Sequence, residues 1–264
     1  MTFAIPFPAI DPVIISLGPL AIRWYSLAYI AGLLLGWRLL RRLVQREPQV
    51  GGTIEADDFL VWAMLGVILG GRLGYVLFYN FAVYINNPLS ILAVWQGGMS
   101  FHGGLLGVIA ATILFCRRRG LDLWTFADRL ACVAPIGLFF GRLANFINGE
   151  LFGRVTDVPW AVVFPRGGPA PRHPSQIYEA LGEGAVLFLV LMWLVRQDSI
   201  RRRPGFLTGV FFAGYGIARS AVEFFRQPDA HIGFLSFGTT TGQWLSVPLV
   251  LVGLWLMLRT ARKA

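Results

Sequence analysis

The sequence predicts an all-α integral membrane protein with seven transmembrane helices, and three observations carry this prediction. Apolar residues make up 56% of the 264 residues and only 14% are charged, whereas a soluble domain carries about 25% charged residues. The mean hydropathy is +0.62. Seven segments also come close to the roughly 20 mostly apolar residues that a helix needs to cross a bilayer. They are residues 20–40, 57–79, 97–116, 123–147, 176–195, 205–225 and 243–259.

The basic residues predict the orientation of these helices, because Lys and Arg gather in the cytoplasmic connections of membrane proteins. Fourteen of the 23 basic residues follow the first, third, fifth and seventh expected helices, and five lie on the opposite side. We therefore expect the N-terminus outside and the C-terminus in the cytoplasm. The chain is interpreted as a single polytopic membrane domain, 1–264, in which the long outer loop 148–175 forms a small head.

The net charge of +9 does not by itself separate membrane proteins from nucleic-acid-binding proteins, because both can be rich in basic residues. Here the arginines lie mostly between apolar runs, which favours anionic lipid headgroups and predicts no nucleic-acid partner. The two cysteines, Cys116 and Cys132, fall near expected cytoplasmic helix ends, so we expect no structural disulfide. The absence of a Cys-x-x-Cys motif or a His/Cys cluster predicts no metal site.

Three arginines fall inside expected helices, in their outer halves: Arg72, Arg142 and Arg219. Asn145 lies three residues after Arg142 and so shares its helix face. A charged side chain in a bilayer costs about 2.5–3.5 kcal/mol on insertion scales. Three helices that carry this cost at one depth predict a shared polar cavity.

The sixth expected helix carries a polar stripe at steps of four, four and three residues. The stripe consists of Tyr215, Arg219, Glu223 and Arg226. In a purely structural interpretation, Glu223 pairs with Arg219 or Arg226 and holds helices together. Counted against Glu223 and Glu150, however, the arginines are in excess. This excess predicts an anionic ligand, and a guanidinium fork suits a phosphate.

Two histidines lie near the outer face, and each admits a structural and a functional interpretation. His102 lies in 97-GGMSFHGGLLG-107, where five glycines allow a ligand or another backbone to approach closely. A lone histidine is more often structural, but beside a phosphate cavity it is a candidate proton acceptor. His173 precedes an expected helix start at Pro174 or Ser175, with Glu179 in its first turns.

Five segments together resemble the prolipoprotein diacylglyceryl transferase family. The segment 141-GRLANFINGELFGR-154 is similar to the signature of that family. The other four are 70-GGRLGYVLFYN-80, 102-HGGLLG-107, 173-HPSQIYEA-180 and 215-YGIARSAVEFFRQPD-229.

The resemblance implies a seven-helix enzyme of the bacterial inner membrane, with its active site towards the periplasmic leaflet and no cofactor. Such enzymes transfer the diacylglyceryl group of phosphatidylglycerol to the lipobox cysteine of a preprolipoprotein signal peptide. They form a thioether and release glycerol-1-phosphate, the first step of lipoprotein maturation. The important positions of the family fall on Tyr25, His102, Arg142, Asn145, Glu150, Gly153, Tyr215, Arg219, Glu223 and Arg226.

This reaction predicts roles for the polar residues. Arg142 and Arg219 are expected to grip the phosphate, and His102 is the first candidate to accept the thiol proton. In the alternative, His102 only positions substrate and the arginine charge lowers the pKa of the thiol. The expected binding residues are Tyr25, Arg72, Asn145, Glu150, Gly153, Arg154, Tyr215, Glu223 and Arg226, with Glu223 holding Arg219 or Arg226 and Glu150 paired with Arg154.

Two other classes of protein share some of these features. Secondary transporters and lipid flippases also carry intramembrane arginines and glycine-broken helices. They usually show internal repeats and a binding site near the midplane. We find no repeat, and the charges lie towards one face. A structural scaffold would leave the excess of positive charge unexplained, so the enzyme is the favoured interpretation.

Overall fold

The computed structural model describes residues 5–8, 10–11, 13–17, 20–228, 233–235 and 238–261. Helices dominate this part of the chain, and the chain forms two compact units. The first unit consists of Met1–Leu39 and Asp128–Ala264, and the second of Leu40–Ala127. Asp229, which ends the segment 215–229, lies outside the described residues, as do the basic residues Arg262 and Lys263.

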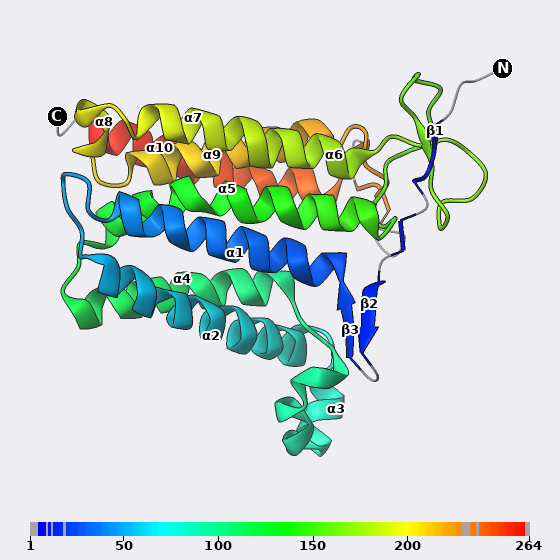
Figure 1. The fold of residues 1–264 in the computed structure, drawn as a ribbon, viewed down its shortest axis with the longest axis horizontal. Coiled ribbons are helices and arrows are strands. Elements are labelled where there is room, and N and C mark those ends of the chain that lie inside the picture. Colours follow the sequence, from blue (N-terminus) through cyan, green and yellow to red (C-terminus); the bar gives the residue numbers. More distant parts are fainter. Residues whose placement is uncertain are drawn as a thin grey trace. The chain divides into compact units, whose positions relative to one another are not determined.

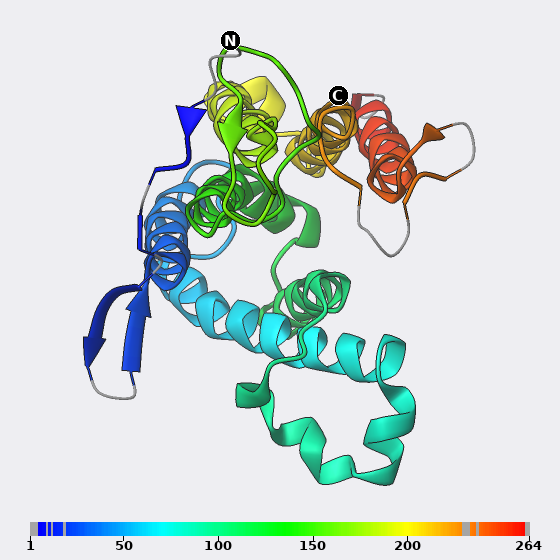
Figure 2. The same ribbon diagram turned by 90° about the vertical axis from the view of Figure 1, so that its right-hand side faces the viewer.

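The second unit is built on two long helices, α2 (Thr53–Phe78) and α4 (Phe101–Arg119). They are joined by α3 (Phe81–Asn86) and two 3₁₀ turns, η1 (Pro88–Leu92) and η2 (Val94–Gln96), which form the cyan-to-green loop in Figure 2. In Figure 1, α2 and α4 lie side by side.

Glycines explain how closely α2 and α4 pack. A Cβ added to Gly107 would meet the carbonyl oxygen of Gly66, and one added to Gly70 would meet that of Gly103. Small residues four apart allow two membrane helices to bring their backbones together. The glycines near His102 are expected to allow close approach of either a ligand or another backbone. Close approach of another backbone is confirmed at Gly103 and Gly107.

This packing predicts that Gly107→Ala destabilises the protein by about 1–3 kcal/mol, the usual cost of forcing extra atoms into a packed interface. Gly137→Ala is the matched control, because an added Cβ there has no neighbour within 4 Å and Ala favours a helix by about 1 kcal/mol over Gly. Thermal unfolding in detergent micelles compares the unfolding temperatures of the two variants. Equal unfolding temperatures for the two variants would contradict the packing argument.

The first unit contains the remaining long helices. These are α1 (Trp24–Leu43, whose last four residues belong to the second unit), most of α5 (Leu123–Ile147), α9 (Phe206–Val222) and α10 (Thr241–Ala261). One further rod has three parts: α6 (Ser175–Glu179), the π-helical segment η3 (Ala180–Val186) and α7 (Leu187–Leu194). The short α8 (Asp198–Arg201) follows it.

The start of α9 is fixed by a buried carboxylate from α5. Asp128 is 1% exposed and accepts hydrogen bonds from the backbone nitrogens of Gly205 (2.9 Å) and Thr208 (2.7 Å). It also accepts one from the Thr208 hydroxyl at 2.7 Å. The first N–H groups of a helix have no partner within the helix. Asp128 satisfies two of these groups across helices, which sets where α9 begins relative to α5.

Among the described residues, short strands occur only in the first unit. Strand β1 (Ile5–Pro6) pairs in parallel with β4 (Val162–Val163), and β2 (Val13–Leu17) pairs antiparallel with β3 (Leu20–Arg23). Strand β4 belongs to the segment 148–175, where backbone bonds join Val162 to Arg172 in both directions at 2.9 Å. This segment therefore has its own hydrogen-bonded structure, and we refer to residues 148–175 as the head.

Each of the seven expected ranges contains a helix. Five helices in the described part of the chain are long and apolar enough to cross a membrane. They are α2, α4, α5, α10 and the rod Ser175–Leu194. Of the other two, α9 is apolar but has only 17 residues, and α1 ends in three arginines within its last six residues. The chain is thus a mostly helical, multi-pass membrane protein.

Candidate functional site

A cluster of buried ion pairs lies inside the first unit, and we call it the ion cluster. Its members are Arg142 on α5, Glu179 on α6, Glu183 on η3, Arg219 and Glu223 on and just after α9, and Arg226 beyond α9. Both Glu179 and Glu183 are 0% exposed. They are four residues apart on one rod and so point from the same face.

Glu179 is the centre of the ion cluster because it contacts all three arginines. Its Oε1 accepts hydrogen bonds from Nη1 of Arg219 and from Nη1 of Arg226, the latter at 2.9 Å. Its Oε2 lies 3.1 Å from Nε of Arg142, as an ion pair without hydrogen-bond geometry. One carboxylate thereby draws together three guanidinium groups from three segments.

Glu183 is paired more weakly than Glu179. Its Oε2 accepts one long hydrogen bond, at 3.4 Å, from Nη2 of Arg142. Its Oε1 lies 4.0 Å from Nη1 of Arg219 and accepts no hydrogen bond from any described residue. A buried carboxylate usually has several strong hydrogen bonds. Glu183 is therefore the member of the ion cluster whose charge is least compensated.

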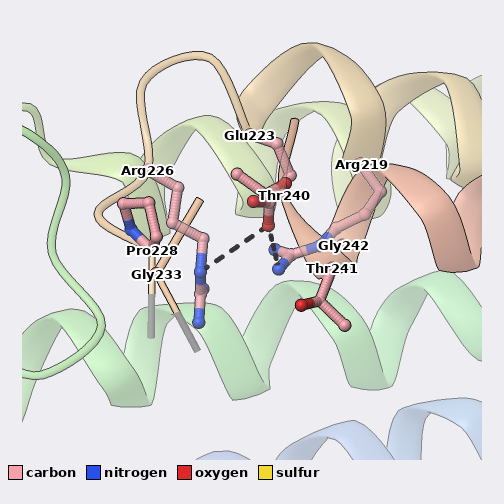
Figure 3. A pocket seen from close by; sticks show the side chains of 8 residues that line it. All are labelled: Arg219, Glu223, Arg226, Pro228, Gly233, Thr240, Thr241 and Gly242. Carbon is pink, nitrogen blue, oxygen red and sulfur yellow. Dashed lines mark ion pairs between the residues drawn. The ribbon is translucent and has the colours of Figure 1, made fainter. Parts of the chain in front are cut away.

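Glu223 pairs with Arg219, four residues before it, and lies near Arg226, three residues after it, as the sequence predicted. It forms an ion pair with Nη2 of Arg219 and lies 3.8 Å from Nε of Arg226. Figure 3 shows both guanidinium groups turned towards its carboxylate. A pocket opens beside these side chains (Figure 3). Its described walls are Arg219, Glu223, Arg226, Pro228, Gly233, Thr240, Thr241 and Gly242.

The predicted excess of positive charge is wrong as a count, because Glu179 and Glu183 were left out of it. Glu179 resembles an ordinary carboxylate in a first helical turn, and Glu183 lies four residues later in an apolar run. Their spacing was the available signal. A π-helical segment between helices is itself often found at functional sites. The structure replaces an arginine surplus with a nearly balanced set of charges.

The residues of the head make other contacts than expected. Glu150 accepts a hydrogen bond from Nδ2 of Asn145 at 2.8 Å. Arg154 donates instead to the backbone carbonyls of Arg226 (2.9 Å) and Glu223 (3.0 Å). The expected pair between Glu150 and Arg154 is therefore wrong. Arg154 instead fixes the backbone that carries two members of the ion cluster.

Gly153 lies where a side chain has no room. A Cβ there would stand 2.5 Å from the carbonyl oxygen of Phe225 and 2.6 Å from Cβ of His173. Its N–H donates to the carbonyl of His173 at 2.8 Å. Gly153 therefore lets the head pack against the start of α6 and the end of α9, which explains the residue without any contact to a ligand.

His173 belongs to an aromatic contact in the head. Its Nδ1 lies 3.1 Å from the hydroxyl of Tyr178, which also accepts a hydrogen bond from Trp160 at 2.6 Å. Its ring centroid is 5.1 Å from that of Phe225. Burial, and then the charge of Arg154, lower the pKa of His173 below its ordinary value of 6.5. These contacts support the structural interpretation of His173.

The lowered pKa predicts a pH dependence of stability. The folded protein disfavours protonated His173, so unfolding takes up a proton below the ordinary pKa of 6.5. The free energy of unfolding should therefore fall as the pH drops below 6.5 and be free of this effect above it. Thermal unfolding between pH 5 and pH 8 checks this (values spanning the ordinary histidine pKa). His173→Gln should flatten the profile, and parallel profiles for variant and wild type would contradict the prediction.

The second unit holds two of the predicted site residues, Arg72 and His102. Arg72 is 3% exposed, and all of its guanidinium nitrogens donate to backbone carbonyls. Nε donates to Ile91, Nη1 to Gly97 and Gly98, and Nη2 to Ser90 and Ala93, at 2.6–3.3 Å. Arg72 thus holds the loop between α2 and α4, whereas Arg142 and Arg219 both contact Glu179 in the first unit.

His102 is the second residue of α4 and is exposed, with its ring 5.7 Å from that of Phe101. The helix begins four residues later than expected, because Gly97 and Gly98 have positive φ and Ser100 caps Gly103 at 3.2 Å. Exposure leaves the ring of His102 free to meet a substrate, so it remains a candidate.

Two tyrosines complete the set of predicted residues. Tyr25 on α1 bonds Tyr29 through the hydroxyls at 3.1 Å and lies within electrostatic range of Glu150 and Arg142. Tyr215 lies one turn before Arg219, within electrostatic range of Arg142, Glu183 and Arg219. Both rings therefore border the ion cluster. No group of three or more His, Cys, Asp or Glu side chains suited to a metal ion occurs in the described part of the chain.

Comparison with known proteins shows the family. The family model described as prolipoprotein diacylglyceryl transferase matches residues 12–259. The chain belongs to the prolipoprotein diacylglyceryl transferase family. This transferase chain is 64% identical to the phosphatidylglycerol–prolipoprotein diacylglyceryl transferase of Paramagnetospirillum magneticum, over all of both chains. It is 62% identical to the enzyme of that name from Rhodospirillum rubrum, over 96% of this chain and 93% of the relative. Against that of Azospirillum brasilense it is 59% identical over 98% of each. The resemblance inferred from the five segments is confirmed.

Proposed function

We propose that this transferase moves the diacylglyceryl group of phosphatidylglycerol to the cysteine thiol of a preprolipoprotein signal peptide. The proposal rests on the names of the relatives, which match nearly all of the chain, and on the ion cluster. The observation that carries it within the molecule is the placement of Arg142 and Arg219 around the same buried carboxylate. Two guanidinium forks on facing helices suit a phosphodiester.

The pocket at the end of α9 supports phosphate as the group that is bound. Its walls carry the guanidinium groups of Arg219 and Arg226 together with Thr240 and Thr241. Guanidinium N–H groups and threonine hydroxyls are donors that suit phosphate oxygens. We assign Arg142 and Arg219 to the phosphate. Asn145 and Tyr215 lie near enough to these arginines to hydrogen-bond the rest of the headgroup.

The chemistry needs a thiolate nucleophile and a stabilised leaving group. The substrate thiol attacks the glycerol carbon, the C–O bond to phosphate breaks, and a glycerol phosphate leaves. Negative charge grows on the departing phosphate, and preorganised donors aimed at such charge are worth about 10²–10³ in rate each. We propose that Arg142 and Arg219 stabilise the charge on the departing phosphate and that His102 accepts the thiol proton.

The orientation of the chain is part of the proposal. We infer seven spans in the bacterial inner membrane, with the C-terminus in the cytoplasm and the head 148–175 in the periplasm. The support is the excess of arginines at one end of the helices, such as the three that end α4. In this orientation the head and the start of α6 face the periplasm, where a secreted signal peptide arrives.

A transfer assay on the purified protein tests the function. Phosphatidylglycerol and a synthetic lipobox peptide are supplied, and the peptide is followed by mass spectrometry. The expected result is a mass gain of one diacylglyceryl group, which is abolished when the cysteine of the peptide is replaced by serine. A folded protein that modifies neither peptide would reject the proposal and lead to a test of lipid movement across vesicles.

A further inference from the structure

The ion cluster is already close to neutral before any ligand enters. Among the described residues it holds three guanidinium groups and three carboxylates. Two charged groups near it, Arg154 and Glu150, are one of each sign. A phosphodiester brings one further negative charge. In a site where charges are poorly screened, an uncompensated charge costs several kcal/mol.

The three carboxylates differ in how well they are paired. Glu179 contacts three arginines, and Glu223 contacts two. Glu183, although fully buried, accepts only the 3.4 Å hydrogen bond from Arg142 and has one oxygen without a hydrogen bond from any described residue. Protonation would therefore weaken the fewest ion pairs and hydrogen bonds at Glu183. A protonated carboxyl would also gain a donor there.

The groups that face Glu183 come from three elements. Arg142 lies on α5, Arg219 and Tyr215 lie on α9, and Glu179 lies on the rod of Glu183 itself. The two cations in this set are the arginines that we assign to the phosphate. When they turn their donors to a ligand, the charge that opposes Glu183 is shared with that ligand. The remaining neighbours, Tyr215 and Glu179, supply no positive charge.

We propose that Glu183 takes up one proton when an anionic phosphodiester binds to Arg142 and Arg219, so that lipid binding is coupled to proton uptake at Glu183. The proton comes from solvent and cancels the charge that the headgroup adds. No covalent bond other than the O–H of the carboxyl is formed. This inference deepens the proposed function and rests on its phosphate site.

Calorimetry measures the coupling directly. Short-chain phosphatidylglycerol is titrated into the purified full-length protein in zwitterionic detergent, in PIPES and in Tris at the same pH. The difference in heat between two buffers of different ionisation enthalpy gives the protons taken up per lipid. We expect close to one, and a Kd that rises with pH by up to about tenfold per unit, as linkage requires. Binding of lipid to the wild type without uptake of protons at any pH from about 6 to 9 would overturn the inference.

Two variants locate the proton. Glu183→Gln keeps the shape of the side chain and should bind lipid with no proton uptake and no pH dependence of Kd. Asp157→Asn removes an exposed acid of the same unit and should keep the uptake of the wild type. Uptake that persists in Glu183→Gln would overturn the inference and place the proton on another group. If Glu183→Gln does not fold, Glu183→Ala takes its place, and wild-type binding without proton uptake still overturns the inference.

Arg142→Ala tests the phosphate site independently of the proton uptake at Glu183. We expect this variant to lose lipid affinity at least tenfold. If it binds as tightly as the wild type, the phosphate site is wrong, and the inference falls with it. If it loses affinity while wild-type binding takes up no proton, the phosphate site stands and the assignment to Glu183 alone is rejected.

Discussion

Replacing Arg219 with alanine is expected to lower the rate of diacylglyceryl transfer by at least about a hundredfold. Removal of a single donor that stabilises growing charge costs about 10²–10³ in rate. Arg219 also pairs with Glu179 and Glu223, so its loss leaves two buried carboxylates with fewer partners. The transfer assay with phosphatidylglycerol and a lipobox peptide gives the rate, and Arg142→Ala should behave alike.

Two further variants make this prediction specific. Arg219→Lys keeps the charge but cannot form the planar fork, so it should recover only part of the activity. Arg118→Ala removes an exposed arginine at the end of α4 and should transfer at the wild-type rate. Wild-type transfer by folded Arg219→Ala protein would show that the ion cluster does not bind the phosphate.

Replacing Glu179 with glutamine is expected to destabilise the protein by about 3–5 kcal/mol, the usual cost of breaking a buried ion pair by removing one partner. The change removes the negative charge that three guanidinium groups share. An amide has the same shape as the carboxylate, so lost packing does not explain the effect. Thermal unfolding in detergent micelles measures it.

Asp58→Asn is the matched control for Glu179→Gln. Asp58 pairs with Arg119, and the two side chains are 39% and 40% exposed. Exposed pairs contribute no more than about 1 kcal/mol. If both carboxylate-to-amide variants unfold within a degree or two of the wild type, the ion cluster would not be a significant source of stability.

The positions of the helices could be predicted from the sequence because they follow from local properties. A run of about 20 apolar residues is helical in a bilayer, since every backbone group must be paired within its own segment. The boundaries depend on residues that cap or interrupt a helix. The range 97–116 began too early because Gly97 and Gly98 adopt positive φ and hold the chain outside the helix.

The site was predicted in part. Arg142, Arg219, Glu223 and Arg226 were recognisable as polar residues in apolar surroundings, and the structure joins them. Glu179 and Glu183 were missed because a carboxylate near a helix start is common. Arg72 satisfied the same sequence criterion as Arg142, yet its donors bond the backbone carbonyls of the loop between α2 and α4.

The class of the protein, the approximate place of each helix and the family can all be predicted from the sequence. Composition, apolar run length and short motifs are properties of contiguous residues. Which charges meet, in contrast, is seen only in the folded chain. The pairs of Glu179 and Glu183 with the arginines join residues 36 to 47 positions apart. Such contacts depend on how helices rotate and pack, and no local pattern in the chain specifies that rotation.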